Sequence, residues 1–157
     1  MRVRFTAPSG WIRQAFPPPQ RGVYLRSPVA AGSADSASIL LLDAVVATGK
    51  LEEQLASFVD DGCRDGTASG KGKPAPFKSK AGPGASLAVS VKFGSGGFFK
   101  GAAREEQRIF AVVDAGPRRL PLVFLGAPKA PRGPFDALLG SIEPMPAQDE
   151  LFLVWVG

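Results

Sequence analysis

The chain of 157 residues has no histidine, a single cysteine, Cys63, and only two methionines. Without histidine, the Ser-His-Asp and Cys-His catalytic arrangements and all histidine metal sites are excluded, and one cysteine cannot form a multi-cysteine metal site. We therefore expect a protein that is not an enzyme and that holds no cofactor and no metal ion. An enzyme stays open as an alternative only if two acidic side chains with strongly raised pKa values converge in a cleft.

Long hydrophobic runs are also absent. The longest, 39–42 and 151–156, are far shorter than the roughly 20 residues that a membrane-spanning helix needs. The first five residues include two arginines and no apolar stretch of the kind that a secretion signal carries. The sequence thus predicts a cytoplasmic protein without membrane insertion. The single cysteine fits a reducing compartment, and it fits equally a secreted chain whose leader has been removed.

Apolar residues make up 45% of the chain and charged residues 21%, and the 19 glycines and 15 prolines indicate many loops. This composition is typical of a folded globular protein and lacks the low hydrophobicity of a disordered chain. A length of 157 residues suits one compact domain. We expect a single domain over 1–157, in which 62–84 forms a mobile basic loop and 144–157 forms a C-terminal extension strand.

The net charge of +5 is unevenly distributed. Residues 1–34 and 67–104 contain five and seven basic residues and no acidic one, whereas 35–66 contains seven acidic residues against two basic ones. If the two basic segments lie side by side, they form a positive face that attracts an acidic protein, a nucleic acid or an anionic lipid. The alternative is a solvated loop whose lysines keep exposed sheet edges soluble. No recognised nucleic-acid module accompanies these bases, so we expect no specific nucleic acid.

Alternating or continuous apolar patterns predict strands along most of the chain. The apolar run within 38–46 predicts a strand in the middle of a sheet with both of its faces covered. The strands at 104–114 and 120–125 are separated by a short turn and are expected to form an antiparallel hairpin. The last strand needs cover from this sheet or from another molecule. The predicted strands are 3–6, 22–27, 38–46, 87–93, 104–114, 120–125 and 151–156, with an edge strand expected around 75–80.

Two segments have helical periodicity. Apolar residues at i, i+4, i+7 and i+8 from Leu51 predict an amphipathic helix over 50–61. Thr48 is expected to cap the start of this helix, and Gly62 is expected to supply a left-handed residue at its end. A second helix is predicted over 133–141 because its apolar residues follow the same spacing and a proline stands in its first turn.

The order of these elements resembles the PsbP-like superfamily, which groups the photosystem PsbP proteins with the nuclear-transport Mog proteins, the DcrB-like proteins and the Eag-type chaperones of type six secretion. The resemblance rests on the motif FTAPSGW at 5–11, the helix at 51–59, and the segments LVFLGAP at 122–128 and FDALLGSI at 135–142. It implies an α+β fold, an α/β/α sandwich in which an antiparallel sheet of about six or more strands has helices packed on both faces. It also implies a domain that acts by binding other proteins. The strand at 151–156 departs from the family's usual ending.

Five residues are candidate contacts for a partner. Phe98 and Phe99 follow a run of glycines and either fill the local core or anchor a partner. Trp155 lies in the apolar C-terminal strand, and Lys71 and Lys73 lie in the basic loop, where they would steer an acidic partner.

The acidic residues after the first helix offer no recognisable metal site. Asp60, Asp61 and Asp65, together with Asp43, match no calcium-loop spacing, and we expect them to be solvated.

The sequence favours a non-enzymatic protein-binding module, an adaptor or a chaperone, whose sheet or sheet edge binds an apolar or acidic segment of another protein. A chaperone for a secreted effector in a bacterial secretion system is the sharper form of this hypothesis. The alternative is a structural subunit or an immunity protein that joins a larger assembly through its apolar C-terminal strand. A homo-oligomer is also open.

Overall fold

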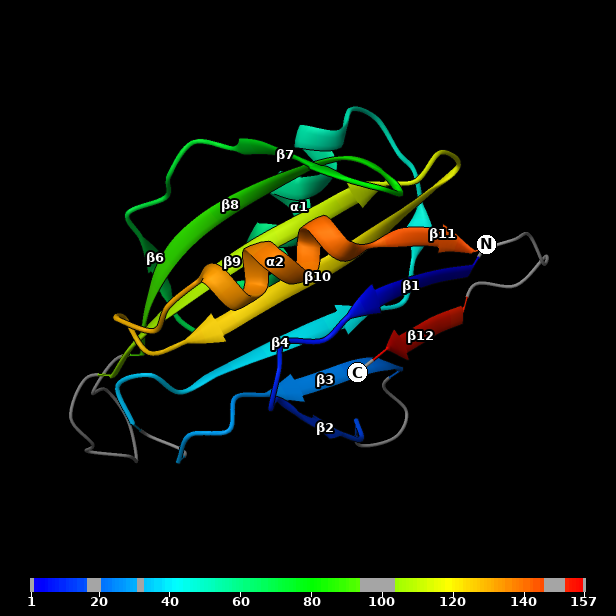
Figure 1. Cartoon of the computed structure of the whole chain (residues 1–157). Helices are drawn as coiled ribbons and strands as arrows, with labels where there is room; N and C mark the ends of the chain where they lie inside the picture. Colours follow the sequence, from blue (N-terminus) through cyan, green and yellow to red (C-terminus); the bar gives the residue numbers. More distant parts are fainter. Residues whose placement is uncertain (1, 17–20, 31–32, 94–103, 146–151, 157) are drawn as a thin grey trace.

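A large antiparallel sheet and a small second sheet form most of the protein in the computed structural model, which describes all residues except 1, 17–20, 31–32, 94–103, 146–151 and 157 (Figure 1). The described part contains twelve strands and two helices. In chain order they are β1 (Arg2–Thr6), β2 (Ile12–Gln14), β3 (Gly22–Arg26), β4 (Ala37–Leu42), β5 (Val45–Val46), α1 (Leu51–Gly62), β6 (Thr67–Ser69), β7 (Ala75–Ser79), β8 (Gly82–Phe93), β9 (Arg104–Asp114), β10 (Arg118–Gly126), α2 (Gly133–Ser141), β11 (Glu143–Met145) and β12 (Phe152–Val156).

The large sheet has the strand order β2-β3-β4-β10-β9-β8-β6, with β5 also paired to β10 and β7 also paired to β8. The predicted hairpin of β9 and β10 is confirmed, since the two strands pair antiparallel from Arg119↔Asp114 to Gly126↔Gln107. The predicted edge strand around 75–80 is confirmed as β7. The short strand β6, which also lies within 62–84, was not predicted.

The expected α/β/α sandwich with helices packed on both faces is wrong. Helices of 12 and 9 residues are about 18 and 14 Å long, whereas seven strands side by side span roughly 30 Å, so neither helix forms a layer. Helix α1 packs on β8 and β9. Helix α2 lies on the other side together with the small sheet β11-β1-β12, so strands stand where a layer of helices was expected (Figure 1).

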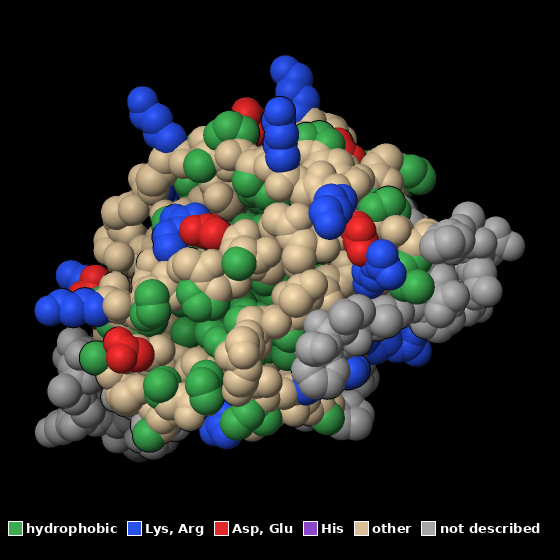
Figure 2. Space-filling view, viewed as in Figure 1, with side chains coloured by type: hydrophobic (Ala, Val, Ile, Leu, Met, Phe, Trp, Pro, Cys, Tyr) green, Lys and Arg blue, Asp and Glu red, His purple; other side chains and the backbone are tan. Residues whose placement is uncertain are grey.

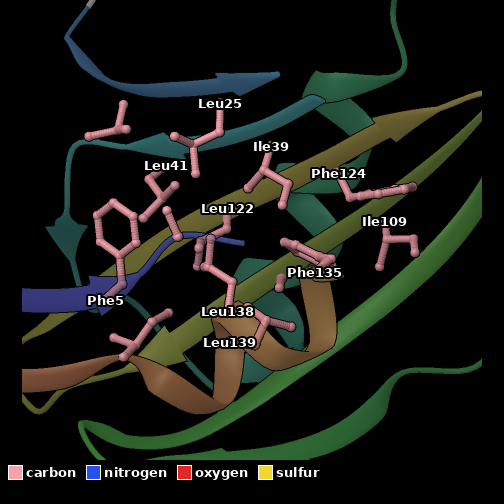
Figure 3. Close-up of a cluster of buried hydrophobic side chains, with 14 of the residues drawn as sticks. Phe5, Leu25, Ile39, Leu41, Ile109, Leu122, Phe124, Phe135, Leu138 and Leu139 are labelled. Carbon is pink, nitrogen blue, oxygen red and sulfur yellow. The ribbon is translucent and has the colours of Figure 1, made fainter. Parts of the chain in front are cut away.

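Two hydrophobic clusters lie on opposite sides of the large sheet, because successive side chains of a strand point to opposite faces. Phe110 and Val112 of β9 pack with Leu55 and Val59 of α1. The larger cluster lies under α2 and the small sheet, and Figure 3 shows its side chains converging from β1, α2 and the central strands. The labelled members are Phe5, Leu25, Ile39, Leu41, Ile109, Leu122, Phe124, Phe135, Leu138 and Leu139.

Helix α1 begins and ends close to the predicted limits, but neither of its expected terminal residues has the expected role. The backbone N–H of Lys50 donates to the Glu53 side chain at 3.2 Å, and Thr48 makes no cap. Gly62 is the last helical residue and does not have a positive φ. A Cβ at Gly62 would collide with the ring of Phe110, so this position needs glycine for close packing on the sheet.

The C-terminal strand β12 pairs in parallel with β1 of the same chain, from Arg2↔Phe152 to Thr6↔Val156. This strand thus pairs within its own chain, as part of the small sheet.

Candidate functional site

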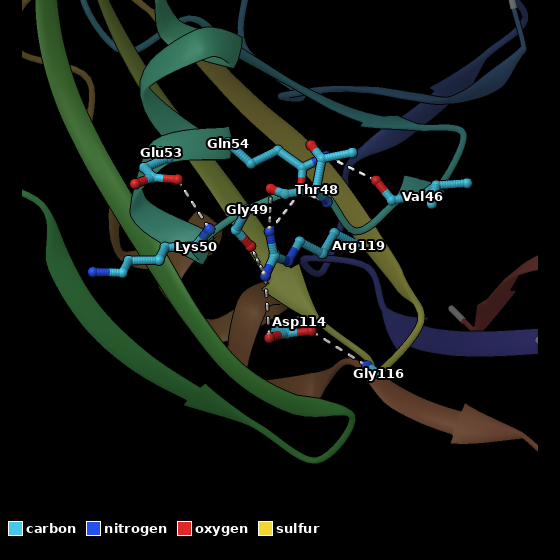
Figure 4. A network of polar contacts seen from close by, with 9 residues as sticks. All are labelled: Val46, Thr48, Gly49, Lys50, Glu53, Gln54, Asp114, Gly116 and Arg119. Carbon is cyan, nitrogen blue, oxygen red and sulfur yellow. Dashed lines mark hydrogen bonds and ion pairs between the residues drawn. The ribbon is translucent and has the colours of Figure 1, made fainter.

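Helix α1 is fixed at its start by a buried arginine from the sheet (Figure 4). The side chain of Arg119 donates to the carbonyl oxygens of Thr48 and Gly49, both at 3.0 Å, and to Gln54 Oε1 at 2.7 Å. Gln54 in turn donates to the carbonyl oxygen of Val46 at 3.0 Å. Because these contacts join β10, β5 and the first turn of α1, they set where the helix starts on the sheet.

A second buried arginine fixes the other end of α1. Arg108 of β9 donates to the carbonyl oxygen of Gly62 and forms a two-point ion pair with Asp65 at 2.7 and 2.9 Å. The hydrogen bond from Arg108 holds the pKa of Asp65 below its usual value, and the same pairing raises the pKa of Arg108. Beside it, burial raises the pKa of the Cys63 thiol, which is unfavourable for a reactive thiolate.

Held in this position, α1 covers β8 and β9 but not β3 and β4, and a strip of apolar side chains is left without a helix over it. We call this strip the open face. The cross-strand pairs Tyr24↔Leu40 and Leu40↔Val123 form one row across it. The open face consists of Ile12, Tyr24, Arg26, Ser38, Leu40, Leu42, Val123 and Leu125. Of these residues Ile12 is exposed, Val123 is buried, and the others are half-buried.

The expectation that the strand within 38–46 has both faces covered is confirmed for one face, whereas the other face is covered only in part. Ile39 and Leu41 are fully buried under α2 and the small sheet, whereas Leu40 and Leu42 point to the other side and are half-buried, and Leu40 packs against the edge of the cluster under α1. The sequence contained a signal for this site, namely four successive apolar residues in one strand, but it did not show that one face is covered only in part.

A β-bulge extends the open face toward α1. Leu41 is paired with Leu122, and Val45 is paired with Arg119. The chain thus advances by four residues from β4 to β5 while β10 advances by three, so β4 and β5 contain one extra residue. The extra residue reverses the alternation of side chains, so Val45 points to the same side as Leu42. Val45 is 41% exposed.

Two cavities lie on this side of the sheet. The helix cavity, of about 530 Å³, lies between α1 and β10, and the loop cavity, of about 610 Å³, lies at the opposite ends of β3, β4 and β10. The helix cavity is lined by Val45, Thr48, Gly49, Glu53, Gln54, Ser57, Phe58, Asp61, Val112 and Pro121. The loop cavity is lined by Tyr24, Arg26, Ser27, Val29, Ser33, Ser36, Ala37, Ser38, Arg104, Glu105, Glu106, Leu125, Gly126, Ala127 and Pro128.

The side of α2 has a hollow too, in which hydrophobic side chains gather below the helix (Figure 2). A cavity of about 460 Å³ there is lined by Trp11, Pro134 and Ala137, among others. Trp11 packs against the large hydrophobic cluster, and α2 already covers this part of the sheet. We therefore regard the hollow as the outer margin of the core and the open face as the stronger candidate.

The structure does not bring the predicted partner residues together. Lys71 and Lys73 are exposed, and Lys71 Nζ pairs with Asp60 Oδ1 at 3.2 Å near the end of α1. Trp155 lies in β12 opposite Phe5, in the small sheet. Phe98 and Phe99 lie outside the described residues.

The acidic residues at and after the end of α1 are exposed to solvent, as expected, and they also form ion pairs. Asp61 pairs with Arg64 at 2.8 Å, and Asp65 pairs with Arg108. No group of three or more acidic or cysteine side chains within the described ranges is placed to hold a metal ion. In the same ranges no helix has the length and apolar character needed to span a bilayer.

Comparisons with known proteins identify a fold and no family. No family model matches the sequence, and no curated protein matches it. A solved structure of LpqN, involved in cell envelope biogenesis of Mycobacterium tuberculosis, matches with a TM-score of 0.58. The match has 12% sequence identity and covers 90% of this chain and 83% of that chain. The two chains share a fold. The resemblance to the PsbP-like superfamily remains a prediction.

Proposed function

We propose that this protein is a non-enzymatic protein-binding module whose open face takes an apolar polypeptide segment of a partner. The observation that carries the proposal is the incomplete burial of Leu40 and Leu42 in an inner strand of the sheet. Burial of apolar surface is favourable by roughly 25 cal/mol per Å², so binding of a partner that covers this strip is favoured. Among the residues whose burial is described, four large hydrophobic residues are exposed, and three of them support the same surface: Ile12 and Val45 point to this side, and Val29 lines the loop cavity.

The dimensions of the strip favour a segment over a broad globular surface. Adjacent strands lie about 4.8 Å apart, so β3, β4 and β10 present a strip roughly 10 Å wide with α1 along one side. An extended strand or a single helix about 10 Å in diameter fits such a width. Apolar side chains of the segment would lie on Tyr24, Leu40 and Leu42.

We propose an adaptor or chaperone as the cellular form of this activity. LpqN is described as involved in cell envelope biogenesis, which is compatible with a role in handling an envelope or secreted protein. The alternative is a structural subunit or immunity protein joined through its C-terminal strand. β12 pairs with β1 on one side and is an edge strand of the small sheet, so this alternative stays a second proposal.

Selection from a displayed library of ten-residue peptides tests the proposal. We expect enrichment of peptides rich in apolar residues, with binding measured by fluorescence anisotropy on the full chain. The double variant Ile12→Ser/Val45→Ser removes two exposed apolar contacts from the open face and should weaken binding about tenfold.

The matched control is Val46→Ser. Val46 is the neighbour of Val45, is 62% exposed, and points to the opposite side of the strand. We expect this variant to bind as the wild type does. The proposal is wrong if no peptide is enriched, or if the double variant and the control weaken binding equally.

A further inference from the structure

The loop cavity contains polar groups that the fold itself does not satisfy. In the part of the chain that the structure describes, three buried side-chain nitrogen or oxygen atoms have no hydrogen-bond partner: Arg26 Nε, Ser33 Oγ and Arg119 Nε. Arg26 and Ser33 both line the loop cavity. Since buried polar groups are nearly always hydrogen-bonded, two such groups in one cavity point to a ligand.

Arg26 differs from the other arginines that come from the large sheet and are largely buried. The terminal nitrogens of Arg119 donate to three oxygens of the chain, and all three nitrogens of Arg108 donate to acidic or carbonyl oxygens. Arg26 has no hydrogen bond and no ion pair with any described residue, although it lies half-buried on the open face. Its charge is therefore available to a ligand.

The surrounding groups are largely engaged with one another. Glu106 accepts from Arg108 Nε at 2.8 Å. The hydroxyl of Ser38 bonds to that of Tyr24 at 3.1 Å, and the hydroxyl of Ser27 accepts from the backbone N–H of Ala37 at 3.0 Å. Arg26 and Ser33 are thus the members of the cavity that hold a buried donor without a partner, and the exposed Arg104 and Glu105 lie beside them.

We propose that the loop cavity binds a carboxylate of the segment that lies on the open face, with Arg26 as the ion-pair partner and Ser33 as a second donor. This inference rests on the proposed function and adds the chemistry of the partner: apolar residues followed by an acidic one. Tyr24 and Arg26 are two residues apart along β3, a distance of about 7 Å. Alternate residues of an extended segment have the same spacing, so an apolar side chain of the segment can lie on Tyr24 while an acidic one reaches Arg26. A carboxylate offers two oxygens that match the paired N–H groups of a guanidinium, and Glu105 in the same cavity disfavours a group of higher negative charge.

The selected peptides and their counterparts with glutamine in place of glutamate test the inference. We expect an acidic residue at one end of the selected peptides and about tenfold weaker binding of the glutamine forms. Arg26→Met should remove this tenfold preference, and Arg26→Lys should retain part of it. Arg26→Met should leave the melting temperature unchanged or slightly raised, because it removes an unsatisfied buried donor.

Arg13→Met is the control for the loss of one positive charge. Arg13 is exposed on the adjacent strand β2 and is paired with Leu25. Because residues paired across strands point to the same side, and Leu25 points away from the open face, the Arg13→Met variant should keep the preference for acidic peptides. The inference is overturned if the selected peptides carry no acid, if the glutamine forms bind equally well, or if Arg26→Met keeps the preference. In each of these cases the proposed function stands, whereas failure of every peptide to bind would overturn both.

Discussion

Arginine has two different roles on the side of the sheet that carries α1. Arg108 and Arg119 are buried, and the terminal nitrogens of both donate to oxygens of the chain, so they fix the fold. Arg26 comes from the same sheet but has no partner among the described residues, so it is available for binding. The sequence could not separate the three, because apart from Glu106 the hydrogen-bond partners of Arg108 and Arg119 lie 43 to 71 positions away in the chain.

At the residue scale, the Arg108–Asp65 pair makes stability depend on pH. The pKa of Asp65 is lower in the folded chain than its usual value, so the pairing stabilises the fold above the unfolded pKa of about 3.9 and this stabilisation is lost as the pH falls through the folded pKa. We expect the free energy of unfolding, measured by urea titration, to fall less steeply below about pH 4 in Asp65→Asn than in the wild type.

Asp61→Asn serves as the comparison for this experiment. Asp61 lies in α1, near Asp65, and its ion pair with Arg64 is exposed on both sides. This variant should keep the acid sensitivity of the wild type. If both variants have the same pH profile as the wild type, the Arg108–Asp65 pair is not the source of the dependence.

At the scale of the element, the position of α1 depends on Arg119, since that side chain joins β10 to the residues before the helix. Arg119→Met would remove the donor to the carbonyl oxygens of Thr48 and Gly49 and would leave Gln54 Oε1 with only the backbone N–H of Thr48. We expect a loss of about 2–4 kcal/mol in the free energy of unfolding by urea.

The neighbouring residue gives a matched reference. Arg118 precedes Arg119 in β10 but is exposed, so Arg118→Met should change the free energy of unfolding by no more than about 0.5 kcal/mol. Equal effects of the two substitutions would show that Arg119 does not hold the start of α1.

Element types could be predicted from the sequence more readily than their surroundings. The spacing of Leu51, Leu55 and Val59 predicts α1, and the runs on either side of Gly116 predict the β9–β10 hairpin, because both patterns are local. The partly covered side of β4 was missed, since the apolar sequence 39–42 is the same whether a helix, a sheet or a partner covers it.

At the scale of the whole molecule, the error in the predicted architecture comes from long-range pairing. β1 pairs with β11 and β12, which lie more than 130 residues later in the chain, and no local pattern in 2–6 or 152–156 specifies that contact. The resulting small sheet joins α2 on one side of the large sheet. On the other side α1 covers only β8 and β9, and the open face is the consequence.

The central claim is that a partner segment binds to one side of β4, and neighbouring leucines in that strand test it most directly. Leu40 and Leu42 point to the open face, whereas Leu41 between them is fully buried on the opposite side. When a selected peptide is titrated into methyl-labelled protein, we predict that the NMR methyl signals of Leu40 and Leu42 shift while those of Leu41 stay nearly in place. Shifts of Leu41 as large as those of its neighbours, or no shift of Leu40 and Leu42 at saturating peptide, would contradict the account.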